Sequence, residues 1–173
     1  IAVIIRRLRK HGRAAVVLPD GFLFGTGVKT RLKQRLLEDC NLHTIVRLPN
    51  GVFNPYTSIK TNILFFTKGQ PTKEVWFYEH PYPVGTNSYS KTKPMTFEEF
   101  STEIAWWGEE HNGFKDRIET SQAWRVSAEE LVARDYNFDF ENPHIEEQAK
   151  HDPDELLSEL NQNEKEVKVL LHQ

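Results

Sequence analysis

The chain has 173 residues, enough to bury one hydrophobic core, and 27% of them are charged, with a net charge of −3. It shows no signal-peptide pattern and no apolar run near the roughly 20 residues that a membrane span needs, so we expect no membrane segment. The single cysteine, Cys40, excludes an internal disulfide framework and predicts a buried thiol in a cytoplasmic protein.

The net charge conceals opposite balances in two parts of the chain. Residues 1–70 carry 12 Lys and Arg against 3 Asp and Glu, a balance of +9, whereas residues 71–173 carry 10 against 22, a balance of −12. A basic part beside an acidic part predicts a polyanion, such as nucleic acid, as the partner of the first. The alternative is that solvated helix faces have merely segregated by charge.

The first forty residues predict a helix, a strand and a second helix. Apolar residues recur at helical spacing over residues 1–10. Residues 14–19 then form a continuous apolar run, which is typical of a strand buried on both faces. The next helix is expected over residues 28–39 and opens at the glycine turn Gly25-Thr26-Gly27. This turn does not predict a phosphate-binding loop, because Val28 separates the last glycine from Lys29.

Two further strands, over residues 43–48 and 62–67, are joined by a loop of about ten residues, which is short enough for antiparallel neighbours. The loop carries two aromatic residues, Phe53 and Tyr56, beside two prolines. Loops rarely expose aromatic side chains unless something stacks on them. This loop is therefore the first candidate for a binding site.

The tripeptide Asn54-Pro55-Tyr56 invites comparison with the Asn-Pro-Pro-aromatic loop with which amino-methyltransferases hold an exocyclic amine. One proline is missing, and the loop joins the last two strands of this series, so we do not interpret it as a catalytic loop. Asn142-Pro143-His144 is a weaker match. The seven histidines never pair at metal-binding spacings, and no metal site is expected.

The acidic part begins with one more expected strand, over residues 74–79, and continues as a region of loops and short helices over residues 80–151. Capping boxes are expected where Thr96 and Ser127 each precede a glutamate by three residues. The three tryptophans of this region predict a small satellite core. Residues 152–173 form a helical pattern with a short coiled-coil seam, which either docks on a partner or packs on its own domain.

The segments GRAAVVLPDGFLFGTG, LLEDCNLHTIVRLPNGVFNPYTSIKTNILFFTKG and VWFY resemble the modification (M) subunit of type I restriction–modification systems, an adenine-specific DNA methyltransferase that uses S-adenosylmethionine. Weaker similarity continues through WRVSAEELVARDYNFDFENP. The resemblance implies an α/β fold in which residues 1–79 are the C-terminal part of a Rossmann-like methyltransferase sheet. Strands 14–19 and 43–48 would be its fifth and sixth, and strand 62–67 the antiparallel seventh inserted between them.

In this family the glycine-rich cofactor loop and the Asn-Pro-Pro-Phe catalytic loop belong to earlier strands, and neither motif occurs in this sequence. The chain also begins at Ile1, with Met95 as its only methionine. We therefore expect a fragment of the enzyme without a catalytic residue or an S-adenosylmethionine site, inactive by itself. Without earlier strands, strand 14–19 would present an unpaired edge, and self-association is expected.

The resemblance implies that the target-base side of the active site remains. An aromatic residue after the sixth strand packs on the flipped base in related enzymes, which places Phe53, Asn54 and Tyr56 in target-base binding; the alternative is that Phe53 only caps the core. Phosphate contacts are expected from basic residues of the first part, namely Lys29, Arg31, Arg35, Arg47 and Lys60. The implied partners are double-stranded DNA and the specificity (S) and restriction (R) subunits. A non-catalytic DNA- and protein-binding module is the alternative function.

Overall fold

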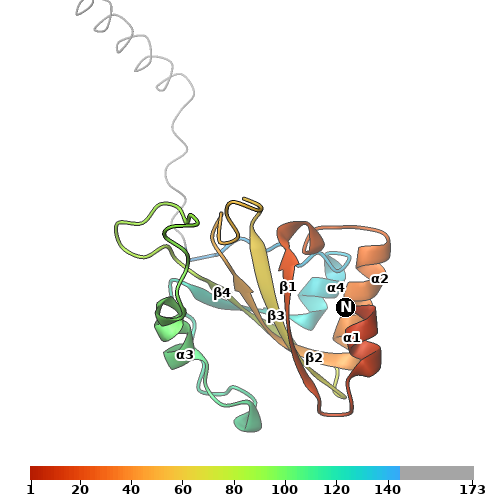
Figure 1. The fold of residues 1–173 in the computed structure, drawn as a ribbon. Coiled ribbons are helices and arrows are strands. Elements are labelled where there is room, and N and C mark those ends of the chain that lie inside the picture. Colours follow the sequence, from red (N-terminus) through yellow and green to blue (C-terminus); the bar gives the residue numbers. More distant parts are fainter. Residues whose placement is uncertain (145–173) are drawn as a thin grey trace, which may run out of the picture.

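The computed structural model describes residues 1–144, which form a single mixed β-sheet with helices on both faces (Figure 1). Its strands are β1 (Arg13–Pro19), β2 (Cys40–Arg47), β3 (Thr61–Lys68), β4 (Glu74–Glu79) and β5 (Ala123–Ser127). Its helices are α1 (Ala2–Arg7), α2 (Val28–Asp39), α3 (Ser101–Trp106) and α4 (Ala128–Ala133), with 3-10 turns η1 (Asp20–Phe22), η2 (Phe97–Phe100) and η3 (Glu110–Asn112). The predicted helix over residues 152–173 lies outside the described residues.

The strand order is β1-β3-β2-β4-β5. β3 is antiparallel to both β1 and β2, β2 is parallel to β4, and β5 is antiparallel to β4. The prediction that an antiparallel strand inserts between strands 14–19 and 43–48 is confirmed. It follows that β1, β2 and β4 run in the same direction, so their carboxyl ends meet at one edge of the sheet.

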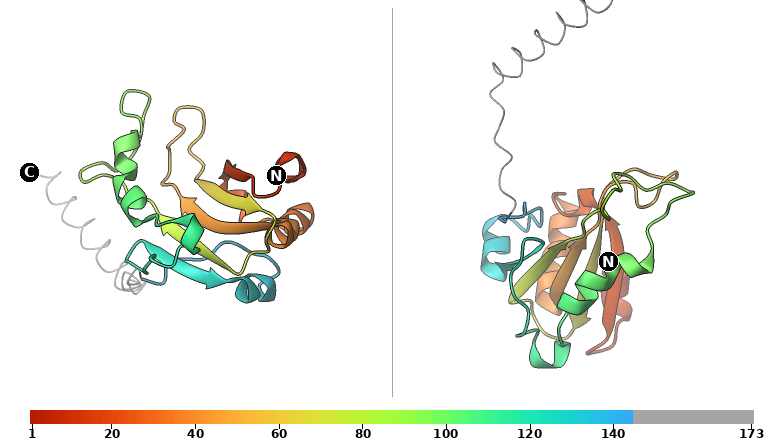
Figure 2. Two further views of the ribbon diagram at one scale, coloured as in Figure 1. Left: turned by 90° about the horizontal axis from the view of Figure 1, so that it is seen from below. Right: turned by 90° about the vertical axis from the view of Figure 1, so that its left-hand side faces the viewer.

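Successive residues of the central strands supply two hydrophobic layers. Ile45 belongs to the layer under α1, α2 and α4, while its neighbour Val46 belongs to the layer under α3. Figure 2 shows α3 and the chain around it on the face opposite to α1 and α2. Cys40 is fully buried in the first layer, as predicted for a structural thiol.

The prediction that strand 14–19 is buried on both faces is wrong. Side chains of β1 alternate between exposed and half-buried; Val16 packs on the core, whereas Val17 is 49% exposed. The reason is that β1 is the edge strand and only one of its faces is covered.

β5 was not predicted, and its presence places one of the three tryptophans in the main core of the sheet. Trp124 on β5 stacks on Phe77 of β4, with the ring centroids 5.4 Å apart, and belongs to the core under α1, α2 and α4. Trp106 and Trp107 pack against the opposite face of the sheet. The three tryptophans thus serve both layers and do not form one satellite core.

The capping box predicted at Thr96 is confirmed, whereas at Ser127 only the N-cap hydrogen bond of the predicted box is formed. Thr96 and Glu99 form the reciprocal box that opens η2, and the Ser127 side chain accepts a hydrogen bond from the Glu130 amide at the start of α4. Among the described helices, none has the length and apolar character to cross a membrane.

Candidate nucleic-acid interface

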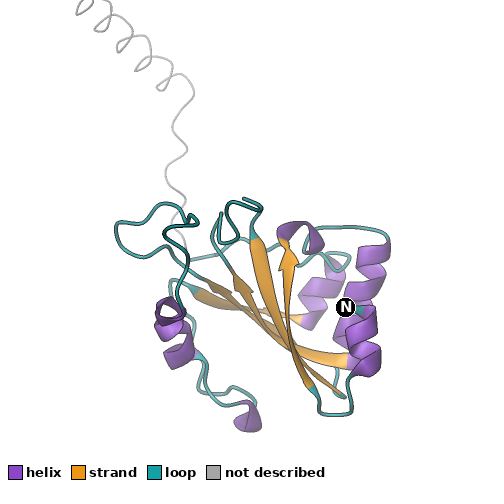
Figure 3. Ribbon diagram, in the orientation of Figure 1, coloured by secondary structure: helices purple, strands orange, loops and turns teal. Residues whose placement is uncertain are grey.

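Three connections leave the sheet at the end where the parallel strands β1, β2 and β4 terminate, which we call the carboxyl edge. They are η1 after β1, residues 48–60 after β2 and residues 80–96 after β4. Figure 3 shows all three at the same end of the sheet, with η1 as a helical turn and the other two as loops. Ligands of open α/β sheets bind at this edge. A cavity of about 400 Å³ opens there, with walls that include Asp20, Arg47, Asn50, Lys60, His80 and Asn142.

The loop of residues 48–60 has a defined backbone. A hydrogen bond from the Leu48 amide to the Thr61 carbonyl closes its base. Gly51 has φ +74°, and a Cβ built on it would lie 2.5 Å from the Nδ2 atom of Asn54. The positive φ therefore favours glycine there, and a larger residue would also displace the Asn54 side chain. Two turns follow, closed by hydrogen bonds from Asn54 to Gly51 and from Tyr56 to Phe53.

The three predicted target-base residues lie together in this loop but are not equivalent. Phe53 is 41% exposed and Tyr56 is 90% exposed, so both rings are accessible to a ligand. The Asn54 amide instead donates a 3.0 Å hydrogen bond to the carbonyl of Tyr89 in the neighbouring loop. The structure therefore leaves two aromatic rings exposed on this loop, whereas the Asn54 side chain is bonded to the neighbouring loop.

Arg47 does not face solvent as a free phosphate ligand would. Its guanidinium donates to the carbonyl of Phe140 at 2.6 Å and to Asp139 at 3.0 Å, and it lies 3.6 Å from Asp20. Asp139 and Phe140 come from the far end of the described chain. Arg47 thus ties residues 139–140 to the cavity wall.

The remaining predicted DNA-binding residues are all exposed, and they divide between the loop and α2. Lys60 lies at the cavity, and Lys29 lies in the first turn of α2, with its Nζ 2.9 Å from the Gly21 carbonyl. Arg35 lies further along α2 and pairs with Asp39 at 3.0 Å. Within residues 1–144, neither Arg31 nor Lys60 forms an ion pair, so both remain available to an anion.

The predicted glycine turn before α2 is confirmed, and the side chains of Lys29 and Lys33 bind carbonyl groups in and before it. Lys33 is almost fully buried, with its Nζ donating to the carbonyls of Leu23 at 2.7 Å and Gly25 at 2.9 Å. Burial lowers the pKa of Lys33 to about 8. A Cβ added at Gly25 would lie 2.2 Å from the Lys29 side chain. The helical pattern of residues 28–39 gave no sign of this role for Lys33, because its carbonyl partners lie in the loop before the helix.

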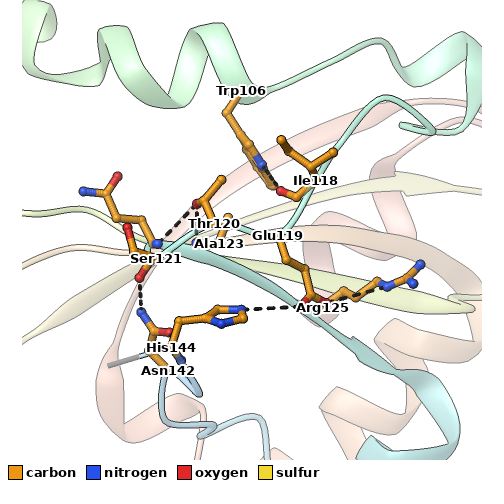
Figure 4. A network of polar contacts seen from close by, with 10 residues as sticks. Trp106, Ile118, Glu119, Thr120, Ser121, Ala123, Arg125, Asn142 and His144 are labelled. Atoms are coloured by element: carbon orange, nitrogen blue, oxygen red, sulfur yellow. Dashed lines mark hydrogen bonds and ion pairs between the residues drawn. The ribbon is translucent and has the colours of Figure 1, made fainter. Parts of the chain in front are cut away.

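A polar network fixes the last described residues beside the same cavity (Figure 4). The Asn142 amide donates to the Ser121 carbonyl at 2.8 Å and to Glu79 at 3.2 Å, and His144 lies 3.4 Å from Glu119. The Trp106 indole donates to the Ile118 carbonyl on the same segment. Asn142 therefore holds the chain in place at the end of β4.

A larger cavity, of about 900 Å³, lies at the opposite edge, where the parallel strands begin. Its walls include His43, a buried ring 4.6 Å from Phe114, and the ion pair of Arg13 with Glu110 at 3.6 Å. Burial and the neighbouring Arg117 and Arg13 lower the pKa of His43 to about 3. In the described part of the chain, no cluster of His, Cys, Asp or Glu is arranged to hold a metal.

A mixed sheet with an antiparallel strand inserted among parallel ones is the C-terminal part of a Rossmann-like methyltransferase sheet. Residues 1–152 match the family described as N-6 DNA Methylase, and the chain belongs to this family. It is 62% identical over all 173 residues to the type I restriction enzyme EcoEI methylase subunit of Escherichia coli. It is 39% identical over 143 residues to the EcoKI methylase subunit of Escherichia coli strain K12.

Solved structures agree with these relatives. The modification subunit of a putative type I restriction enzyme from Vibrio vulnificus YJ016 is 41% identical, with a TM-score of 0.76 over 87% of this chain and 32% of that one. The predicted resemblance to type I modification subunits is confirmed. The chain spans 35% of the EcoEI subunit and 26% of the EcoKI subunit, about a third of their length or less.

Proposed function

We propose that this chain is the target-base side of an adenine-specific DNA methyltransferase, the modification subunit of a type I restriction–modification system. The whole protein would transfer a methyl group from S-adenosylmethionine to an adenine in double-stranded DNA. The observation that carries the proposal is the pair of exposed aromatic rings, Phe53 and Tyr56, on the loop whose Asn50 and Lys60 line the cavity at the carboxyl ends of the parallel strands. Membership of the N-6 DNA Methylase family supports it.

Phe53 is the residue that we assign to the target base. An enzyme that modifies a base inside a duplex must rotate it out of the stack, which costs a few kcal/mol. Stacking of a base on an aromatic side chain recovers about 1–3 kcal/mol. Phe53 suits this role because its ring is exposed while the backbone around it is held by the turn at Gly51 and by Asn54. Tyr56, which is more exposed, would contact the flanking DNA.

Lys60, Lys29 and Arg31 would bind phosphates on either side of the base. Residues 48–60 contain no Asp or Glu, so nothing in the loop itself repels the DNA backbone. Phosphate contacts fix the orientation of a protein on DNA without reading its sequence. Reading of the sequence would then fall to the specificity subunit.

The described residues do not fit a site for S-adenosylmethionine. The glycine turn before α2 is occupied by the side chains of Lys29 and Lys33, and a Cβ at Gly25 already meets Lys29, so no open cradle is left for a nucleoside. We therefore assign no step of methyl transfer to these residues. The cofactor and catalytic loops would come from other parts of the protein, and the chain by itself would be inactive.

The specificity and restriction subunits are the proposed protein partners. A chain that is 34% identical, with a TM-score of 0.73 over 95% of this chain and 35% of that one, comes from a study of complex assembly and conformational transition in a type I R-M system. The acidic second part of this chain, with a balance of −12, would face such partners. A non-catalytic module that binds DNA and protein is the alternative function.

A chimera separates these two functions. Residues 1–173 replace the matching segment of the EcoEI methylase subunit, and adenine methylation is measured in the assembled enzyme. We expect the chimera to be active, Phe53→Ala to lower kcat/KM about 10–100-fold through lost stacking, and Phe53→Tyr to retain most activity. The matched control is Phe97→Ala, an exposed phenylalanine on η2. A chimera that assembles but does not methylate, or equal losses for Phe53→Ala and Phe97→Ala, would contradict the proposal.

A further inference from the structure

We infer that residues 81–93, the loop after β4, form a second DNA-contacting element in which Lys91 and Lys93 bind backbone phosphates next to the target base. This inference rests on the proposed function and extends it to a segment of the acidic part of the chain. It is carried by the shape of the loop, by its charge and by its hydrogen bonds to the loop of Phe53.

The loop ends in a tight hairpin. Ser90 and Lys93 exchange two backbone hydrogen bonds of 3.0 and 3.1 Å, and the Ser90 hydroxyl lies 3.2 Å from that of Thr92. Lys91 and Thr92 therefore occupy the tip. Both lysines are exposed, and within residues 1–144 neither forms an ion pair. Two ammonium groups two residues apart on a short hairpin suit neighbouring phosphates.

The charge of this segment is opposite to that of its surroundings. Between Glu79 and Glu98 the sequence contains no Asp or Glu, although residues 71–173 have a balance of −12. The loop of residues 48–60 shares this property. Carboxylates are thus missing from both long loops at the carboxyl edge, which is what close approach of a polyanion requires.

Hydrogen bonds join the two loops. Asn54 donates to the Tyr89 carbonyl at 3.0 Å, and the Tyr82 hydroxyl donates to the Asn50 carbonyl at 2.8 Å. The rings of Tyr82 and Tyr89 lie 5.5 Å apart. Figures 1 and 2 show both loops projecting side by side beyond the sheet. A phosphate held by the hairpin would therefore lie near the base held by Phe53.

The base of the loop is anchored in the protein. Tyr89 is buried, and its hydroxyl donates a 2.5 Å hydrogen bond to Glu99. His80, where the loop begins, is buried against Glu103 and Phe100. Anchoring at both ends means that the hairpin is held in place before DNA arrives, so little ordering entropy opposes binding.

Salt dependence of DNA binding tests this inference. The full chain is titrated against a fluorescent duplex of about 30 base pairs at 50–300 mM KCl, and log K is plotted against log salt concentration. Since each phosphate contact contributes about 0.9 to the slope, we expect Lys91→Ala/Lys93→Ala to reduce it by about 2. The control Lys73→Ala/Lys115→Ala removes two exposed lysines outside this loop and should leave the slope unchanged. Circular dichroism confirms that each variant is folded.

The variant Phe53→Ala tests the proposed function independently of the two lysines, so that failure of the inference can be told from failure of the proposed function. This variant should weaken binding at every salt concentration without changing the slope. If Phe53→Ala weakens binding but the slope of Lys91→Ala/Lys93→Ala equals that of the unsubstituted chain, the hairpin makes no phosphate contact and the inference is overturned while the proposed function stands. If the unsubstituted chain shows no salt-dependent DNA binding, both are overturned.

Discussion

The carboxyl edge of the sheet, where the parallel strands end, and the opposite edge, where they begin, differ in how their charged and aromatic groups are used. At the carboxyl edge, Phe53, Tyr56, Lys60 and the hairpin lysines are exposed, and two long loops contain no carboxylate. At the opposite edge the cavity is more than twice as large, about 900 Å³ against about 400 Å³. Several of its polar groups, however, are paired within the protein, as in the Arg13–Glu110 ion pair and the hydrogen bonds from Lys68 to the carbonyls of Ile5 and Leu8.

Arg117, which packs against the cavity residues His43 and Phe114, is likewise held within the protein. Its guanidinium lies 3.8 Å from the ring centroid of Phe114 and 4.5 Å from that of Trp106. It donates to the Trp107 carbonyl at 2.7 Å and to the Thr44 hydroxyl at 2.8 Å, and burial lowers its pKa to about 10. The comparison indicates that the volume of a cavity is a poor guide to a binding site. The exposed side chains without a partner in the protein are a better guide, because they are available to a ligand. We expect the opposite edge to stabilise the fold, and we propose that the carboxyl edge binds the ligand.

The largest expected effect tests the stabilising role of the opposite edge. Arg117→Ala removes a buried side chain from between aromatic rings and leaves the Thr44 hydroxyl and the Trp107 carbonyl without their donor. We expect a loss of about 2–4 kcal/mol in the free energy of unfolding, measured by urea titration. Lys60→Ala, at the carboxyl edge, should change it by less than about 0.5 kcal/mol. Similar values for the two variants would remove the distinction between the edges.

The next effect concerns the acid stability contributed by His43. Its pKa of about 3 in the folded chain lies below the ordinary value of 6.5, so the unfolded state binds more protons between these values. The free energy of unfolding should therefore fall as the pH decreases from 6.5 to about 3, with a contribution from His43 on the order of 1 kcal/mol per pH unit.

His43→Gln isolates this contribution, because glutamine does not titrate. Urea titrations of both proteins at pH 7, 5 and 4 should show a smaller decline for the variant, even if its stability at pH 7 is reduced by the lost contact with Phe114. If the free energy of unfolding fell equally with pH in both proteins, protonation of the His43 imidazole would not destabilise the fold. The opposite edge would then be more accessible to water than the burial of His43 indicates.

Most of the fold was predictable because it is encoded locally. β2, β3 and the loop between them form one continuous pattern of apolar runs and turn residues, and α2 has a clear helical spacing. β5 was missed because its five residues have no pattern of their own; their burial arises from pairing with β4 and from Trp124 stacking on Phe77. The exposure of one face of β1 could not be read from its apolar run, because such a run looks the same whether one face or both are covered, although the resemblance predicted the unpaired edge.

The candidate site was predicted in outline, and individual residues were not. Exposed aromatics in a proline-containing loop indicated Phe53 and Tyr56 correctly as accessible groups. The internal role of Arg47 was hidden, because its partners Asp139 and Phe140 lie more than 90 residues away along the chain. The hairpin at Lys91 and Lys93 was overlooked because its surroundings are acidic in sequence. Its place beside residues 48–60 depends on hydrogen bonds between the loops.

The smallest expected effect concerns the free edge of the sheet. β1 pairs with β3 on one side, and among residues 1–144 no strand pairs with its other side. Such an edge invites another strand, and we expect weak self-association of the chain at high concentration, measured by sedimentation velocity. Val17→Lys places a charge on this strand and should weaken association several-fold. Val132→Lys is the matched control, because Val132 has the same exposed fraction of 49% but lies on α4. An unsubstituted chain that stays monomeric would mean that the edge of β1 is already blocked. If both lysine variants weaken association equally, the chains associate through exposed apolar side chains in general and not through β1.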